Sequence, residues 1–437
     1  MNLATLKQVY RSPDLRKRVL VVLGILVVFR FLAHVPVPVP DNAALANFLR
    51  TIFESNQALG FADLFSGGAL TNFSIIMMSV GPYINASIIM QLLTHVVPHF
   101  EALSKEGELG RRKLNQYTRL LTLPLAVLEA FGMVLLIQQT STRITGTDLI
   151  GHPNLFQWIL LISTITAGSM LLMWMGEIIT EKGVGNGVSL IIFCGIVARI
   201  PSAAGQFASL ASGDTSKIIT LAFFLIAALA IIAFVVLLNE GTRNIPVSYA
   251  KRTRGTRVYA GVDTHLPLRV ITAGVIPIIF AVAFLTIPGM LGQLLSSAKT
   301  PWVAAAAQHL TTWFTSTNPI YAITYFLLVV IFTFFYTSVV FNPKDISENL
   351  QKQGGFVPGI RPGTQTATYL RRVINRITLA GALGLALIAV LPFIAQQFTQ
   401  SQVLTFGGTG LLIVVSVAIE TLKQLEAQAI TASYEQY

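Results

Sequence analysis

Long apolar stretches alternate with shorter, more polar ones along the whole chain. A helix needs about 20 predominantly apolar residues to cross the roughly 30 Å of hydrocarbon in a bilayer. The fifth apolar stretch is the least regular, because a Gly-Asn-Gly sequence lies at its start and Pro201 lies near its end. The pattern predicts ten membrane-spanning helices, called spans 1 to 10 below, at residues 19–36, 74–97, 117–138, 156–177, 186–205, 217–239, 270–295, 317–341, 374–396 and 405–425.

Composition supports this interpretation. Of the 437 residues, 53% are hydrophobic and only 11% are charged, and the mean hydropathy is +0.68. Such a chain cannot cover itself with a water-soluble surface, so its solvent is mostly lipid. The single cysteine, Cys194, lies in an apolar stretch and excludes both an intramolecular disulfide and a cysteine-based metal site. We therefore predict an all-α membrane protein.

The positive charge is distributed unevenly. The formal net charge is +11, and most of the 30 Lys and Arg residues precede span 1 or follow even-numbered spans. Because Lys and Arg near span ends mark the cytoplasmic side, and because ten spans leave both termini on one side, we predict a multi-pass protein of the plasma (inner) membrane with cytoplasmic termini. The charge then needs no nucleic-acid partner to explain it.

The first apolar stretch follows a basic segment and therefore imitates a signal peptide. It is too long for one, and an alternating Val-Pro sequence at 35–40 follows it instead of a small-residue cleavage site. We interpret it as span 1. Arg30 lies close enough to the far end of this span for its side chain to reach the membrane interface.

Two of the predicted cytoplasmic loops, 240–269 and 342–373, are about 30 residues long, whereas connections between packed helices usually take two to eight. They are consistent with solvated loops. They are equally consistent with a docking surface for a large acidic or RNA-containing partner. The first loop carries a cluster of cations, namely Lys251, Arg252, Arg254 and Arg257.

The segment 61–71 between spans 1 and 2 is apolar but too short to cross a membrane. Its small residues fit a short, loosely held helix that is easily displaced, or an interfacial re-entrant segment. Polar residues inside the spans are few. The absence of an intramembrane carboxylate pair argues against a proton-coupled pump.

Motifs of catalysis are absent from the sequence. There is no phosphate-binding GxxxxGK[ST] loop, no HExxH and no Cys/His cluster with metal-ligand spacing. His95 and His99 are four residues apart, but Pro98 between them interrupts the helix that would bring them together. We therefore expect no enzyme activity, no cofactor and no metal, so that the energy for any work comes from a partner or a gradient.

Nine short stretches, in order along nearly the whole chain, together resemble the SecY family of protein-conducting channels. They are 65–70 (FSGGAL), 82–93 (PYINASIIMQLL), 105–113 (KEGELGRRK), 185–187 (GNG), 249–252 (YAKR), 264–268 (THLPL), 274–277 (GVIP), 356–363 (FVPGIRPG) and 406–409 (FGGT).

The resemblance implies two five-helix halves, residues 1–205 and 206–437, related by a pseudo-twofold axis and enclosing an hourglass pore. At its neck the family places a ring of aliphatic side chains, some of them smaller here because the chain has Val in two positions. By motif position the ring is Val80, Ile84, Val188, Ile192, Ile279 and Ile413. Positions 80 and 84, like 188 and 192, are spaced to share one helix face.

The resemblance also implies a plug, a short helix under the ring that moves away when the channel opens. It corresponds to Phe61, Ala62, Asp63, Leu64, Phe65, Ser66, Gly67, Gly68, Ala69 and Leu70. Spans 2 and 7 would form a lateral gate into lipid. Pro82, Pro277 and Pro288 are candidates for bends there or for static kinks. The gate residues we expect are Asn85, Ser87, Gln91 and Pro277.

By the same resemblance, the two long loops would bind the ribosome, through rRNA phosphates, and the SecA motor, with Arg361 as the main single contact. One basic residue common at the tip of the first loop in relatives is Thr256 here. Expected partners further include the SecE and SecG subunits and unfolded preproteins with signal sequences. The expected function is translocation of unfolded polypeptides across the plasma membrane and lateral release of membrane segments.

Two other classes of protein fit less well. A secondary transporter for a small solute would share the ten spans, but it predicts a polar cluster at mid-membrane, which the spans lack. An intramembrane enzyme would need a nucleophile with a base or a metal, and no such constellation is recognisable.

Overall fold

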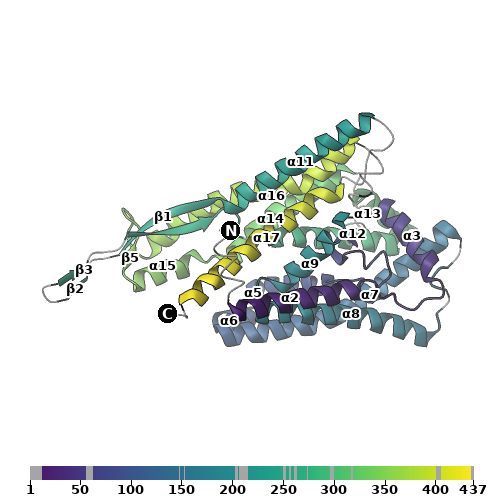
Figure 1. Ribbon diagram of the computed structural model, residues 1–437, viewed down its shortest axis with the longest axis horizontal. Coiled ribbons are helices and arrows are strands. Elements are labelled where there is room, and N and C mark those ends of the chain that lie inside the picture. The colour runs from purple at the N-terminus through teal and green to yellow at the C-terminus, as the bar shows by residue number, and fades with distance from the viewer. Residues whose placement is uncertain are drawn as a thin grey trace.

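The computed structural model describes residues 12–55, 63–146, 148–151, 153–201, 205, 215–249, 252–254, 257–259, 263–272, 274–295, 300–315, 318–399 and 405–434. Helices form an elongated bundle, and a β-hairpin projects from one end of it (Figure 1). The chain is thus mostly helical, in agreement with the sequence pattern.

Each of the ten predicted spans overlaps one helix. These helices are α2 (Pro13–Leu32), α5 (Gly81–Val96), α7 (Glu108–Thr145), α8 (Leu155–Lys182), α9 (Gly187–Val197), α11 (Thr215–Glu240), α12 (Ile276–Leu295), α14 (Pro319–Val340), α16 (Thr364–Thr399) and α17 (Thr405–Tyr434). In the described part of the chain, further helices of eight or more residues lie between or beside them, namely α3 (Asn42–Ser55), α6 (Pro98–Lys105), α13 (Pro301–Trp313) and α15 (Pro343–Lys352).

Several of these helices are suited to a bilayer. Among the residues searched, segments 108–145, 155–182, 319–352 and 364–394 are long and apolar enough to cross a membrane, and three further apolar helices are shorter. Exposed Leu, Ile and Phe side chains along α2, α7 and α8 face outward, as lipid-facing residues do. The chain is a multi-pass membrane protein. The count of ten spans and the pseudo-twofold relation between two halves stay predictions.

Span 2 begins later than its apolar pattern predicts. Residues 74–80 form turns, and the helix starts at Gly81. Pro82 therefore lies in the first turn of α5, and Pro277 occupies the same place in α12, where the missing N–H has no helical partner to lose. The expectation of bends or kinks at these two prolines is therefore wrong. Pro288 does lie inside α12.

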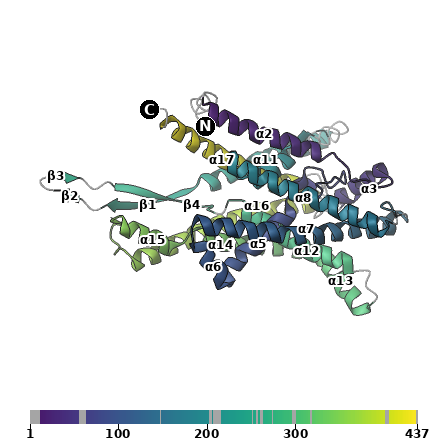
Figure 2. The ribbon, with the colours of Figure 1, turned by 90° about the horizontal axis from the view of Figure 1, so that it is seen from below.

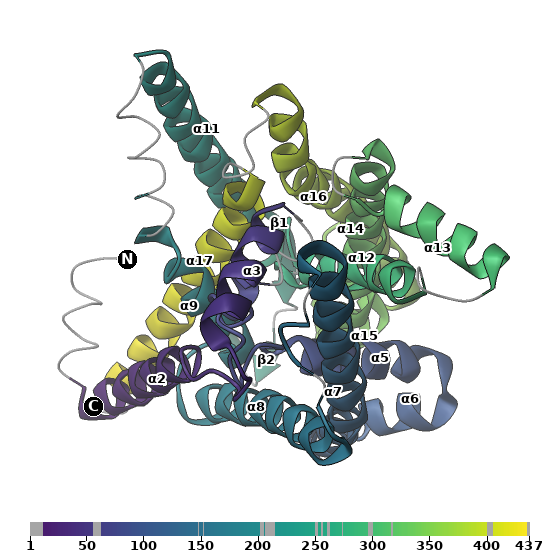
Figure 3. The ribbon, with the colours of Figure 1, turned by 90° about the vertical axis from the view of Figure 1, so that its right-hand side faces the viewer.

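The helices of the chain's first and second parts lie on different sides of the bundle. Viewed from the end away from the hairpin, α2, α7 and α8 lie on one side, and α11, α14 and α16 lie on the other (Figure 3). Helix α12 contacts both α5 and α7, and α17 contacts α9, so the two groups meet along these pairs.

The first long loop contains a sheet, which the all-α prediction missed. Strand β1 (Thr242–Tyr249) pairs antiparallel with β4 (Asp263–Arg269), and β2 (Arg252–Arg254) pairs with β3 (Arg257–Tyr259) at the far tip (Figure 2). Ile245 and Val247 of β1 alternate with exposed residues, which is the period of a half-buried strand. The all-α prediction is therefore wrong for these residues.

The second long loop joins the same structure. Strand β5 (Gly355–Phe356) adds to the other edge of β1, giving the order β4-β1-β5. Below the sheet, side chains from both loops and from α16 form a separate small core, which consists of Ile245, Leu268, Val357, Leu370, Val373 and Ile374. We call the sheet, α15 and this core the loop platform. It continues directly into the bundle, because only Gly241 separates α11 from β1, whereas residues 270–275 separate β4 from α12.

The first turn of α2 and the last turns of α17 both lie toward the platform end of the molecule (Figures 1 and 2). At that end Lys423 of α17 forms an ion pair with Glu240 of α11, with 2.7 Å between Nζ and Oε1. The start of α2 and the end of α17 thus lie on the same side as the platform, the arrangement expected for an even number of spans.

Candidate pore and plug

All six residues of the expected ring lie in one apolar cluster. Ile192, Ile413, Val80 and Ile279 are buried members of it, and Ile84 and Val188 pack against it. Ile84 N donates to Val80 O, so these two residues keep the i, i+4 relation although α5 starts only at Gly81. The structure thus brings together residues from α5, α9, α12 and α17 that are far apart in the sequence.

The Gly-Asn-Gly sequence before Val188 explains how α9 is positioned. The Asn186 side chain caps the helix by accepting from Val188 N and Ser189 N at 3.1 and 3.3 Å. Gly187 lies so close to α8 that an added Cβ would be 1.9 Å from Gly176 O. Val188 therefore lies directly beside Gly176, and α9 is held tightly against α8.

A polar hollow lies on the platform side of the ring. Its lining includes Ser189, next to ring residue Val188, and Ser416, one turn from Ile413. Charged side chains at the platform end, including Arg269 and Lys423, complete it. On its platform side, the apolar ring thus borders a hollow whose lining includes polar and charged side chains that water can contact.

The plug lies against the ring cluster. Residues 63–66 form one helical turn, whereas Phe61 and Ala62 fall outside the described residues. Leu64 and Ala69 are buried members of the same cluster as the ring, and Phe65 packs against it. Gly67 and Gly68 have φ angles of +68° and +90°, so the chain turns back immediately after the helical turn.

Hydrogen bonds tie the segment that follows the plug to the end of span 1. Ser74 Oγ donates to Leu32 O at 2.7 Å, and Asn72 Nδ2 donates to Ala33 O at 3.3 Å. Val37 N donates to Phe73 O at 2.9 Å. The chain immediately after the plug is therefore attached to the end of span 1.

Two arginines reach the plug from neighbouring spans. Arg30 Nη1 of α2 donates to Gly67 O at 2.6 Å. Arg199, just after α9, forms an ion pair with the buried carboxylate of Asp63. The expectation that Arg30 extends to the membrane interface is wrong, because a plug carbonyl provides a nearer acceptor.

At the expected lateral gate, α5 and α12 are in contact. Asn85 Nδ2 donates to Glu129 Oε1 of α7 at 2.7 Å and thus bonds on its own side of the boundary. Gln91 Nε2 donates to Ser87 Oγ at 3.2 Å, and Gln91 Oε1 is buried without a partner among the described residues. Pro277 lies in the first turn of α12.

The expected docking residues lie at the platform end. Arg252, Arg254 and Arg257 belong to β2 and β3 at the tip of the hairpin, with Arg254 directly opposite Arg257, and Lys251 falls outside the described residues. Arg361 is exposed in a turn of the platform. Its carbonyl accepts from Thr366 Oγ1 at 3.0 Å, and Gly363 O accepts from Ser347 Oγ at 2.6 Å, so hydroxyls hold this turn from both sides.

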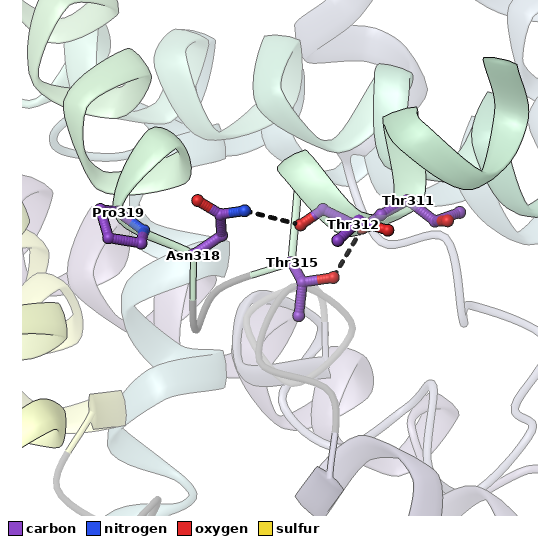
Figure 4. A pocket seen from close by; sticks show the side chains of 5 residues that line it. All are labelled: Thr311, Thr312, Thr315, Asn318 and Pro319. Carbon is purple, nitrogen blue, oxygen red and sulfur yellow. Dashed lines mark hydrogen bonds between the residues drawn. The ribbon is translucent and has the colours of Figure 1, made fainter.

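A second hollow lies at the end of the molecule opposite the platform. Thr311, Thr312, Thr315, Asn318 and Pro319 line it where α13 leads into α14 (Figure 4). Asn318 Nδ2 donates to Thr312 O, and Thr315 Oγ1 donates to Thr311 O, so these polar groups serve the turn itself. This geometry gives no reason to expect a ligand there.

Sequence reasoning placed Asp63 in the plug but named no contact for it, and it assigned no role to Arg199 or Glu129. Each is a charged residue within or beside an apolar stretch, and such residues usually have a specific partner. That signal identifies them as candidates, but it does not name their partners.

The fold and the site define a class. The chain is a multi-pass membrane protein whose helices converge on an aliphatic cluster closed by a small buried segment. The SecY family model matches residues 74–422. The chain is 42% identical to the SecY subunit of the protein translocase of Streptomyces galbus, covering 99% of each chain. It is 43% identical to that of Mycobacterium leprae, covering 97% of each. This chain belongs to the SecY family, which consists of translocation channels and not of enzymes, and the resemblance found in its motifs is confirmed.

Solved structures agree on the fold. A protein-conducting channel aligns with 93% of this chain and 90% of its own, with a TM-score of 0.61 and 19% identity. A SecY structure, from work in which the plug domain stabilises the closed state of that channel, aligns with 92% of this chain and 90% of its own, with a TM-score of 0.62 and 20% identity. Sec61 from a canine ribosome-channel complex aligns with 93% of this chain and 90% of its own, with a TM-score of 0.58 and 19% identity.

Proposed function

We propose that this chain forms the pore through which unfolded polypeptides cross the plasma membrane, and that it releases membrane segments into lipid between α5 and α12. One observation carries this proposal above the others. Six aliphatic residues from four spans and the buried face of the plug share one apolar cluster, with a wettable hollow next to it. This is the arrangement that a sealed but expandable pore requires.

The chemistry of the ring suits a polypeptide channel. An aliphatic neck offers no substitute for the water shell of an ion, so it opposes leak. It also offers few hydrogen bonds to a passing chain, so a polypeptide slides without being held. A transporter for a small solute would instead need polar groups at this level to bind its substrate.

The contact between α5 and α12 supports the lateral gate. These two helices belong to different sides of the bundle, and a separation between them would open the apolar cluster toward lipid. The Asn85–Glu129 hydrogen bond joins α5 to α7 and would survive such a separation. The gate would then open without breaking the polar contact beside it.

The platform is the proposed docking surface for the ribosome and for the SecA motor. It is folded, it projects from the bundle, and it carries Arg252, Arg254 and Arg257 at its tip and the exposed Arg361 in a turn. Binding to rRNA phosphates would depend strongly on salt. Because SecY relatives are named as subunits, we also propose SecE and SecG as partners of this chain. The platform and both termini would then face the cytoplasm.

Ion leak through reconstituted vesicles tests the pore. Vesicles containing the assembled complex would be compared with those carrying a deletion of 62–70 or the double change Ile84→Gly and Ile192→Gly. We expect both to raise ion leak while transport of a preprotein still depends on SecA. Equal leak in all three would contradict a pore at the ring.

A further inference from the structure

The plug is joined to the rest of the molecule through charges. Asp63 is the only charged residue in segment 61–71. Its carboxylate is 1% exposed, whereas the Arg199 side chain is 35% exposed. The pair thus joins a buried anion in the plug to a cation that still reaches solvent.

Both oxygens of Asp63 are engaged. Oδ2 pairs with Arg199, and Oδ1 accepts from Thr71 N at 2.8 Å. Removing one member of a buried ion pair leaves the other charge without compensation, which is strongly unfavourable. Arg199 therefore stabilises Asp63 in its buried place, and losing this partner would leave the carboxylate uncompensated.

Close backbone contact fixes the plug at the same place. A Cβ added at Gly67 would lie 2.9 Å from Gly195 Cα, and a Cβ added at Gly195 would lie 3.0 Å from Phe65 O. Leu64 also lies beside Gly410 of α17. The plug thus rests on α9, the helix that leads to Arg199.

Helix α9 also carries two of the ring residues, Val188 and Ile192. A polypeptide that widens the ring must displace these side chains. Because Arg199 follows the same helix by two residues, an outward movement of α9 draws the guanidinium away from Asp63. Ring and plug are in this way connected through one helix.

We propose that Asp63 and Arg199, assisted by Arg30 on Gly67 O, form a charged latch on the plug. The latch sets how much binding energy a signal sequence must supply before the channel opens. This inference rests on the proposed function, and it adds the residues that set the threshold. They are positioning residues, since they act on the plug and not on the translocating chain.

Isosteric changes isolate the charge. Asp63→Asn keeps an oxygen for Thr71 N and removes only the negative charge. Arg199→Gln removes the positive charge, and Arg199→Lys keeps it. The exchange Asp63→Arg with Arg199→Asp restores a pair of opposite charges. Arg143→Gln serves as the matched control, because Arg143 is exposed in the last turn of α7, away from the plug.

The experiment measures two properties of vesicles that contain equal amounts of the assembled complex: ion leak and SecA-driven export of a preprotein that lacks its signal sequence. We expect Asp63→Asn and Arg199→Gln each to raise ion leak and export by about tenfold. A tenfold change corresponds to a free-energy difference of ~1.4 kcal/mol between the closed and open states. Ion leak and export should stay within about twofold of the unchanged chain in the three other variants, which is well below a tenfold rise. These variants are Arg199→Lys, the charge exchange and Arg143→Gln.

The outcomes separate the two proposals. If deletion of 62–70 raises leak and Asp63→Asn does not, the latch is overturned and the pore stands. If both single variants leak but the charge exchange does not restore the seal, the residues act through packing and the latch is again overturned. If even the deletion leaves leak unchanged, the pore itself is wrong.

Discussion

The plug segment and the loop platform lie at different levels of the same bundle, and both interrupt the pattern of long apolar spans. The platform is stabilised by a strand pairing and by its own apolar core, so its parts hold one another. The plug has no core of its own. It is stabilised by single polar contacts to α2 and α9 and by apolar contact with the ring cluster. The difference shows which region can leave its place without unfolding. The plug can move once its few contacts with neighbouring helices break, whereas the platform cannot be displaced without disrupting its own core.

The largest effect should follow a change that separates the plug from α9. Gly67→Ala introduces a Cβ 2.9 Å from Gly195 Cα, and neither backbone can move far, so we expect ion leak to approach that of the plug deletion. Gly68→Ala is the matched control. It has a similarly unfavourable φ of +90° but nothing within 4 Å of its Cβ. Equal leak in the two variants would attribute the effect to backbone strain and not to the contact.

A change in the platform core should affect the platform alone. Ile245→Ala removes a side chain that is 1% exposed in β1, and we expect the platform to be destabilised locally by about 2 kcal/mol or more. Amide protection in β1 and β4, measured by hydrogen exchange, should fall by roughly 30-fold. Asn244→Ala, at the exposed neighbouring position, should leave protection unchanged. A rise in ion leak with Ile245→Ala would show that the two regions are not independent.

Neutralising the tip should change binding without changing structure. With Arg252, Arg254 and Arg257 replaced by Gln, we expect weaker ribosome binding and a salt dependence whose slope is shallower by about one unit for each phosphate that the tip no longer binds. Binding to reconstituted vesicles over a range of salt concentrations measures this. The same slope with and without the three arginines would place the ribosome-binding surface elsewhere. Arg143→Gln controls for the loss of a single positive charge and is compared with each of the three single replacements.

The smallest effect concerns a surface pair beside the platform. Lys105 donates a hydrogen bond to Glu101 on α6, and this contact lowers the pKa of Glu101. The same contact raises the pKa of Lys105, and the negative charge of nearby Asp345 on α15 raises it further. Because the pKa of Glu101 is lower in the folded than in the unfolded state, Glu101 stabilises the folded protein at neutral pH. This stabilisation is lost as the pH falls through the folded pKa. Glu101→Gln should therefore lower the melting temperature slightly at pH 7 and not at pH 3. Equal shifts at both values would exclude the charge as the cause.

Much of the helical fold was predictable, because each of the ten predicted apolar stretches overlaps one helix. The start of α5 was not, since residues 74–80 are as apolar as a span. Hydrogen bonds within the segment, together with those to the end of span 1, hold these residues in turns. The platform sheet was missed because its strands are short and its edge strand β5 comes from a distant loop. Alternation at Ile245 and Val247 was the available signal.

The site was predictable in a different way. Nothing in the periodicity distinguishes Ile192 or Ile413 from ordinary packing residues, and the resemblance to a family was needed to select them. The partners of Asp63 could not be found even so. Arg199 is distant in sequence, and no local pattern indicates that two charges pair once the chain has folded.

The attachment of the platform has a mechanical consequence. On one side the hairpin follows α11 through Gly241 alone, and Val270 N donates to Gly241 O at 2.8 Å, so strand and helix are joined almost without slack. On the other side residues 270–275 separate the hairpin from α12. A torque applied to the hairpin tip therefore passes to α11 almost directly. The path to α12 is longer, and it runs through Ile271 and Val275, which are buried in the same apolar cluster as the ring, so part of the load reaches that cluster before it reaches the helix at the gate.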